Sequence, residues 1–235
     1  MKVYKFNEHS NLDPTTIDFI DGKINESTFR QYVELEVLNE SVMTYVKEKI
    51  INVLYSFLVK ASEIGFSILS KFKSFFTWLF ETISKWKEKH PLLYKVIIIT
   101  LIIIILLLVS ASSAHAQSKG QPIPESQLDL AIGWLDLIKG KTDLDALEVN
   151  KAIAHLVDLK DGNIEITGLG DKALQIADSA IQTSGKMIED ARSGLDKGDE
   201  STAKMCLNLM QKGADYVSAI YTKTDTGEVI KLGIK

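Results

Sequence analysis

Hydrophobic residues form one long helical stripe in the first half of the chain. Between residues 50 and 86 apolar side chains recur on one face of a helix, while Asn, Ser and Glu occupy the opposite face. The stripe repeats after eleven residues, an interval that keeps it nearly straight along a helix. Ile50, Ala61, Phe72 and Ile83 form one such series. The pattern predicts one long amphipathic helix over residues 27–90, capped near Ser27, after an irregular segment at residues 1–26.

An uninterrupted apolar run follows this stripe. Residues 96–109 are apolar except for Thr100, so every face of a helix built from them would be hydrophobic. Crossing about 30 Å of hydrocarbon takes roughly 20 helical residues. Flanking apolar and small residues extend the run to that length. The sequence therefore predicts a single transmembrane helix over residues 92–114.

The same residues also fit an internal signal sequence. A lysine-rich flank, a short apolar core and a tail of small residues are the three parts of such a signal. The tail ends in Ala114-His115-Ala116, and cleavage after Ala116 would release a soluble helical domain that begins at Gln117. Some 90 residues precede the run, whereas a signal normally begins the chain. We therefore expect a retained signal-anchor helix, with cleavage as the alternative.

Shorter helical repeats occupy the second half. After a linker at residues 117–125, apolar positions recur with helical spacing over residues 126–139, 143–160, 171–195 and 200–221. The last two segments carry heptad stripes joined by a short turn, which indicates an antiparallel helical hairpin. Residues 126–235 are thus expected to form a small four-helix bundle. Alternating residues at 163–167 and 228–232 predict two short paired strands in a fold that is otherwise mainly α.

Charge is divided unevenly along the chain and predicts an orientation. Residues 47–95 hold 9 Lys against 4 acidic residues, whereas residues 117–235 hold 14 basic against 19 acidic residues. The positive-inside rule then places the N-terminus in the cytoplasm and the C-terminal domain outside it, in the periplasm of a bacterium. Arg30 and Arg192 are the only arginines, which argues against a nucleic-acid partner.

The long stripe has two interpretations, which remain open. It could lie in the membrane surface, with aromatic side chains among the lipid headgroups and lysines on anionic lipid. The residues expected to do this are Lys60, Lys71, Phe72, Phe76, Trp78, Lys85 and Trp86. Alternatively the stripe packs on a protein, and the small Ala61 and Gly65 let another helix approach closely. The expected partners are a lipid bilayer, further copies of the chain, or other membrane and envelope proteins.

Residues capable of chemistry do not form a recognisable catalytic pattern. Gly168 and Gly170 mimic a dinucleotide loop, but a second helix follows them instead of a strand, so Asp171 is interpreted as a helix cap. Cys206 occupies a core position of its heptad, and the four histidines are scattered, without metal-binding spacing. We therefore predict no catalytic, metal or cofactor site and no enzymatic activity.

Two functions of different classes follow. The first is a structural or scaffold component, such as one belonging to a phage particle (virion) or an envelope complex, anchored by one helix and carrying an extracytoplasmic interaction domain. The second is a membrane-perturbing protein of the holin or lysis-accessory kind, which would use the amphipathic and apolar helices together. Release of a soluble helical domain by cleavage after Ala116 is the remaining alternative.

Overall fold

The computed structural model describes residues 12–37, 43–141, 147–164 and 166–221. In these ranges the chain is mainly helical and contains no strand, which confirms the mainly α class. The elements are α1 (Pro14–Ile20), α2 (Glu26–Val37), α3 (Met43–Ile64), α4 (Ser67–Ser84), α5 (Pro91–Ser118), α6 (Glu125–Lys141), α7 (Leu147–Lys160), α8 (Ile166–Ala191), the 3-10 turn η3 (Arg192–Gly194) and α9 (Lys197–Tyr221).

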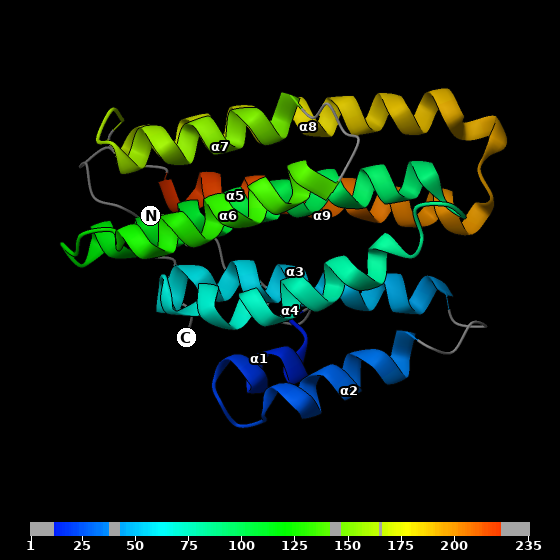
Figure 1. The fold of residues 1–235 in the computed structure, drawn as a ribbon, viewed down its shortest axis with the longest axis horizontal. Coiled ribbons are helices and arrows are strands. Elements are labelled where there is room, and N and C mark those ends of the chain that lie inside the picture. Colours follow the sequence, from blue (N-terminus) through cyan, green and yellow to red (C-terminus); the bar gives the residue numbers. More distant parts are fainter. Residues whose placement is uncertain (1–11, 38–42, 142–146, 165, 222–235) are drawn as a thin grey trace, which may run out of the picture.

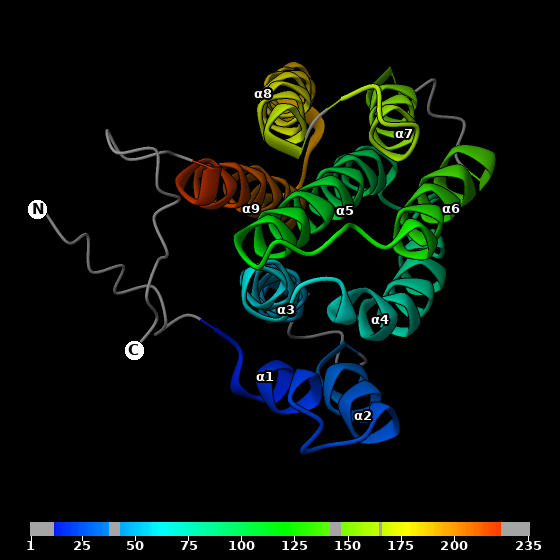
Figure 2. The same ribbon diagram turned by 90° about the vertical axis from the view of Figure 1, so that its left-hand side faces the viewer.

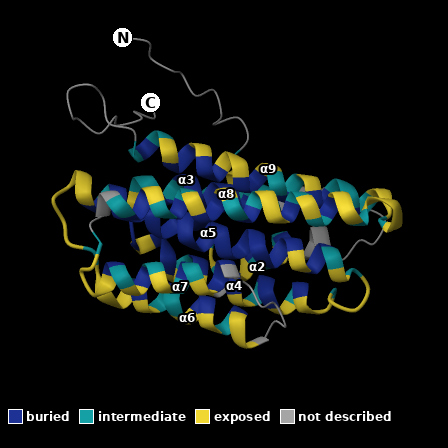
Figure 3. Ribbon diagram, turned by 90° about the horizontal axis from the view of Figure 1, so that it is seen from above, coloured by how far each residue is buried: buried dark blue, intermediate teal, exposed yellow. Residues whose placement is uncertain are grey.

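The apolar helix α5 is the centre of the molecule. Helices α3, α4, α6, α7, α8 and α9 all contact it, and they surround it in the end-on view of Figure 2. Helices α1 and α2 add an outer layer against α3. Figure 3 shows α5 buried along its length, with exposed residues on the outer faces of the surrounding helices. Each outer helix has one apolar stripe, and α5 offers an apolar surface on every side to receive them.

This arrangement differs from the expected separation of the two halves by a membrane. Helices α3 and α4 from the first half lie around the same helix as α6–α9 from the second half, and α3 also packs directly on α9. Helices α6–α9 are present close to their predicted ranges. They contact one another in chain order and close on α5, and the structure does not confirm a separate four-helix bundle.

The predicted single helix over residues 27–90 is wrong, because the chain reverses direction at Gly65. Gly65 has a φ of +65°, in the left-handed region that favours glycine, and it ends α3. Helix α4 then runs back alongside α3, as Figure 1 shows. A Cβ on Gly65 would lie 2.8 Å from the His115 ring. The glycine therefore provides both the turn and the close approach of α5.

The N-terminal segment is more regular than predicted. Asp13 caps α1 by accepting a hydrogen bond from the Thr16 amide at 2.7 Å, and Pro14 occupies the first turn. Helix α2 begins at Glu26, and its cap is the Asn25 side chain, which accepts the Thr28 amide at 2.9 Å, so Ser27 is not the capping residue. The irregular assignment of residues 1–26 is thus wrong at residues 14–20.

The start of α8 corrects two further predictions. The helix begins at Ile166 and includes Gly168, Gly170 and Asp171, so residues 166 and 167 are helical where a strand was expected at residues 163–167, and Asp171 is not a cap. The proposed partner strand at residues 228–232 lies outside the described residues. Gly170 has a packing role, because a Cβ there would lie 2.7 Å from the Tyr221 ring.

Gly213 on α9 should be intolerant of larger side chains. A Cβ at this position would lie 2.9 Å from Leu107 on α5 and 3.0 Å from Leu58 on α3. We expect Gly213→Val to lower the free energy of unfolding by about 1–3 kcal/mol, because the added methyl groups overpack this junction. Urea denaturation measures the loss. Gly133→Val is the matched control, since nothing lies near that exposed position of α6. Equal stability of the two variants would contradict the packing.

Candidate functional site

The apolar helix α5 is the candidate functional element. Its 28 residues extend about 42 Å at 1.5 Å per residue, which exceeds the hydrocarbon thickness of a bilayer. It is the one helix of the described chain that is long and apolar enough to cross a membrane. Length and composition are shared by membrane spans and by core helices of soluble proteins, so the contacts of α5 are the more informative feature.

Three hydroxyl groups of α5 are satisfied by the helix itself, whereas the buried Ser112 Oγ has no hydrogen-bond partner among the described residues. Thr100 Oγ1 donates to the Val96 carbonyl at 2.8 Å, and Ser113 Oγ donates to the Val109 carbonyl at 2.8 Å. Ser110 Oγ donates in the same way to the Leu106 carbonyl, four residues earlier, at 3.0 Å. Such bonds move with the helix, because both partners belong to it. These hydroxyls therefore need no partner from the surrounding helices.

Hydrogen bonds between α5 and other described helices occur only toward its ends. At the first end, Nδ1 of His90, the N-cap residue, lies 2.6 Å from Asp199 Oδ2 on α9. At the other end, His115 Nδ1 donates to the Ser62 carbonyl of α3 at 3.0 Å, and the Tyr221 hydroxyl donates to the Ser110 carbonyl at 2.6 Å. We call these three bonds the end contacts. Between them, α5 contacts the other described helices by side-chain packing, mostly of apolar residues.

Helices α3 and α9 are joined to each other independently of α5. The Tyr216 hydroxyl lies 2.5 Å from Ser62 Oγ and donates to the Val59 carbonyl at 3.3 Å. Burial raises the pKa of Tyr216 to about 12, and burial also raises the pKa of Tyr221 above its usual range. Both phenols therefore remain protonated donors at physiological pH.

Most of the predicted membrane-surface residues contact protein in this structure. Phe72 and Phe76 are buried, and both rings pack on Trp134 of α6 with centroids 5.5 Å away. Lys71 donates to the carbonyls of Phe19 and Ile20 at the end of α1. In this state the stripe is a contact surface between helices of the same chain.

The remaining predicted residues are more accessible or pack elsewhere. Lys60 pairs with Glu63 at 2.7 Å, and Lys85 is exposed. Trp78 and Trp86 are half-buried, and Trp78 lies against the Phe75 ring with centroids 5.6 Å apart. Of the two small residues expected at a helix contact, Ala61 is buried and Gly65 faces His115, both within the chain.

The predicted cleavage site lies inside the last turns of α5. Ala114 and Ala116 are buried, whereas Gln117 is exposed. A signal peptidase binds its substrate in an extended conformation, so cleavage after Ala116 would require these turns to unwind.

Sequence reasoning missed the residues that hold α5 in place. His90, Asp196 and Asp199 are brought together, with one ligand atom from each within 4.8 Å of the others. Asp196 accepts the Asp199 amide at 2.7 Å and so caps α9, and Asp199 binds His90. These groups fix helix ends. Cys206 is buried on α9, as its heptad position predicted.

Acidification should weaken the bundle through His155 of α7. Burial, followed by the charge of Lys172 on α8, lowers the pKa of His155, and Asp158 opposes them. Its buried Nε2 lacks a hydrogen-bond partner in the structure. The unfolded chain therefore binds a proton at His155 at a higher pH than the folded chain does. The contribution of neutral His155 to the free energy of unfolding is complete above about pH 6.5 and is lost as the pH falls below that value. Urea denaturation across this range should show a flatter pH profile for His155→Leu than for the parent. An unchanged profile would contradict it.

Comparison of the chain with protein-family models, with curated proteins and with solved structures finds no match.

Proposed function

We propose that the protein is a membrane-perturbing protein that stores a membrane-spanning helix inside a water-soluble bundle and delivers it to a lipid bilayer. The observation that supports this most is the contact pattern of α5. A helix long enough to span a membrane is covered by amphipathic helices, and within the described part of the chain it is hydrogen-bonded to them only toward its ends.

Moving α5 from the bundle to lipid exchanges one apolar environment for another. Its backbone and the hydroxyls of Thr100, Ser110 and Ser113 stay bonded within the helix. In water the same surface would be unfavourable, by about 25 cal/mol for each Å² exposed. The end contacts are the polar interactions that this transfer breaks, and each contributes on the order of 1 kcal/mol.

The outer surface of the bundle suits water better than lipid. Lys160 lies 2.6 Å from Asp129, and Lys204 lies 2.7 Å from Glu200, both on outer helices. Exposed charged residues of this kind are unfavourable in hydrocarbon. Release of α5 would also expose the stripe of α3 and α4, with Phe72 and Phe76, as a second membrane-binding surface.

The basic flank of α5 supplies an orientation for the inserted state. Lys85, Lys87 and Lys89 precede the helix and Lys95 lies in its first turns. By the positive-inside rule, these lysines favour the cytoplasmic side for the N-terminal end of an inserted α5. The partner in this proposal is lipid, with self-association of inserted chains as a further step.

Leakage from vesicles tests the proposal. The full chain, purified without detergent, is added to vesicles of equal parts phosphatidylglycerol and phosphatidylcholine that contain a self-quenching dye. We expect dye release, and we expect α5 to become protected from protease added outside. Vesicles that stay sealed while the protein binds them would favour the structural anchor. A product that begins at Gln117 in the native source would favour the cleaved precursor.

A further inference from the structure

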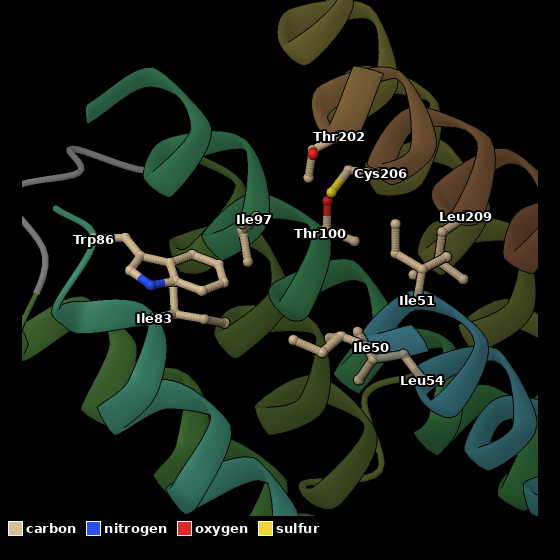
Figure 4. A pocket seen from close by; sticks show the side chains of 10 residues that line it. All are labelled: Ile50, Ile51, Leu54, Ile83, Trp86, Ile97, Thr100, Thr202, Cys206 and Leu209. Atoms are coloured by element: carbon tan, nitrogen blue, oxygen red, sulfur yellow. The ribbon is translucent and has the colours of Figure 1, made fainter. Parts of the chain in front are cut away.

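The amino-terminal hairpin, residues 12–37, forms an outer layer over α3 and α4. It consists of α1 and α2, which pack on α3, and Figure 2 shows this layer on the side of α3 that is turned away from α5. Another side of α3 carries Ile50 and Leu54, which Figure 4 shows beside side chains of α5 and α9. Displacement of the hairpin therefore leaves the contacts of α3 with α5 and α9 in place.

Aromatic rings fill the contact between the hairpin and the two helices beneath it. Phe19 of α1 stacks on Phe29 of α2, with ring centroids 4.4 Å apart. The Phe19 centroid also lies 6.5 Å from that of Phe57 on α3, and the Phe29 centroid lies 5.7 Å from that of Phe75 on α4. Phe75 in turn contacts the half-buried Trp78. The covered surface is therefore aromatic, and it continues to an indole that already meets solvent.

A lysine in this contact is held by backbone carbonyls of the hairpin. Lys71 of α4 donates to the carbonyls of Phe19 and Ile20, and its Nζ lies 5.8 Å from the Phe19 ring centroid. These carbonyls end α1, where helix carbonyls carry partial negative charge. The hairpin thus gives Lys71 the kind of oxygen partners that phosphate groups at a lipid surface would supply.

The hairpin and the segment that includes α4 carry opposite charge. Residues 12–37 hold six acidic residues against two basic ones, whereas residues 67–89 hold five lysines against two glutamates. Aromatic and lysine side chains together on an amphipathic helix are typical of a contact with anionic lipid. An acidic hairpin packed on such a helix competes with anionic lipid for the same surface.

We propose that the face of α3 and α4 under the amino-terminal hairpin is a docking surface for an anionic lipid membrane, and that the hairpin covers it in the water-soluble state. Displacement of the hairpin presents Phe57, Phe75 and Lys71 to the lipid without moving α5. Docking therefore precedes the transfer of α5, and this proposal rests on the proposed function for its membrane target. Since hairpin and lipid exclude each other, weaker packing of the hairpin must give tighter membrane binding.

Matched valine substitutions in the full chain test the cover. Val33 of α2, one turn after Phe29, and Val149 of α7 are both buried, and each is replaced by serine. Cosedimentation with phosphatidylglycerol vesicles measures binding. We expect Val33→Ser to bind roughly tenfold more tightly than the parent, because it removes the burial of one valine from the hairpin. Val149→Ser should bind like the parent. Equal binding by the two variants, or parental binding by Val33→Ser, would overturn the proposal.

A milder variant tests the same contact if Val33→Ser does not fold. Ser56 Oγ on α3 accepts the Asp13 amide at 3.0 Å, and this bond holds the start of the hairpin. Ser56→Ala removes the bond but keeps the ring contacts, so vesicle binding should tighten by roughly fivefold. Dye release from the same vesicles is recorded separately. Tighter binding without dye release would support the docking surface and would contradict the proposed function alone.

Charge variants in the Val33→Ser chain locate the membrane contact. Lys60 lies one turn after Ser56 on the same face of α3. Lys60→Gln should weaken binding to phosphatidylglycerol vesicles by roughly fivefold at low salt. Lys212→Gln, which removes an exposed charge from α9, is the matched control and should not weaken it. Binding to phosphatidylcholine vesicles should be weak in all these chains. Equal effects of the two lysine substitutions, or equal binding to both lipids, would overturn the proposal.

Discussion

A disulfide cross-link between α5 and α9 should abolish the release of vesicle contents while leaving the bundle folded. The cross-link joins cysteines that replace Leu107 on α5 and Gly213 on α9, introduced into a Cys206→Ser background. The Cβ of residue 213 would lie 2.9 Å from the Leu107 side chain, so the two positions face each other. Replacing both also removes the Leu107 methyl group that this Cβ would meet, while the flexible end of Leu58 remains 3.0 Å away. If α5 must leave the bundle, the disulfide blocks it by a covalent bond that thermal motion does not break.

Oxidised Leu107→Cys/Gly213→Cys should release dye roughly tenfold more slowly or not at all, and reduction should restore the parental rate. Leu58→Cys/Gly213→Cys is the matched control. It uses the same position on α9, where the Cβ would lie 3.0 Å from Leu58, but it ties α9 to α3 and leaves α5 unattached. Gel mobility shows the disulfide, and circular dichroism shows the fold. Full leakage from the oxidised α5–α9 variant would contradict the release of α5.

Local patterns predicted α5 and α6–α9 close to their observed ranges, because each of these helices depends on neighbouring residues. The uniformly apolar run identified the core of α5, although Pro91 begins the helix and Ser118 ends it beyond the predicted 92–114 range. The heptad stripes identified α8 and α9 and the turn between them. These features require nothing beyond helical periodicity and end signals.

The turn at Gly65 shows where periodicity fails. The eleven-residue repeat continues through this position, so the apolar stripe carries no mark of a break. The available signal was the glycine itself, which the small-residue interpretation assigned to helix contact alone. In the structure its positive φ ends α3, and its missing Cβ admits His115. Gly65 therefore acts both as a turn residue and as a contact residue. Only the three-dimensional packing reveals both roles.

The partners of the stripe could not be predicted for a different reason. An amphipathic face indicates that it must leave water, but lipid, another protein and α5 all satisfy that requirement. The end contacts pair residues that are more than fifty positions apart, such as His90 with Asp199 and Ser62 with His115. No local spacing connects them, so the histidines appeared scattered.

Loosening α5 should have the opposite effect to tying it. Tyr221→Phe removes the hydroxyl that donates to the Ser110 carbonyl at 2.6 Å, which is an end contact between α9 and α5. Loss of one such bond is worth about 1 kcal/mol, so we expect the open state to be roughly fivefold more populated. Dye release should accelerate by about the same factor if opening precedes insertion.

Tyr216→Phe is the control that isolates α5 from general destabilisation. It removes the same group from the same helix, but its bonds are to Ser62 and Val59 of α3. Both variants should lose similar free energy of unfolding in urea. Only Tyr221→Phe should accelerate leakage, because its bond is broken in the step in which α5 leaves the bundle, whereas the bonds of Tyr216 join α9 to α3 and are still intact at that step. Equal acceleration by the two variants would mean that the bundle unfolds as a whole before it reaches the membrane, and that α5 is not released as a separate element.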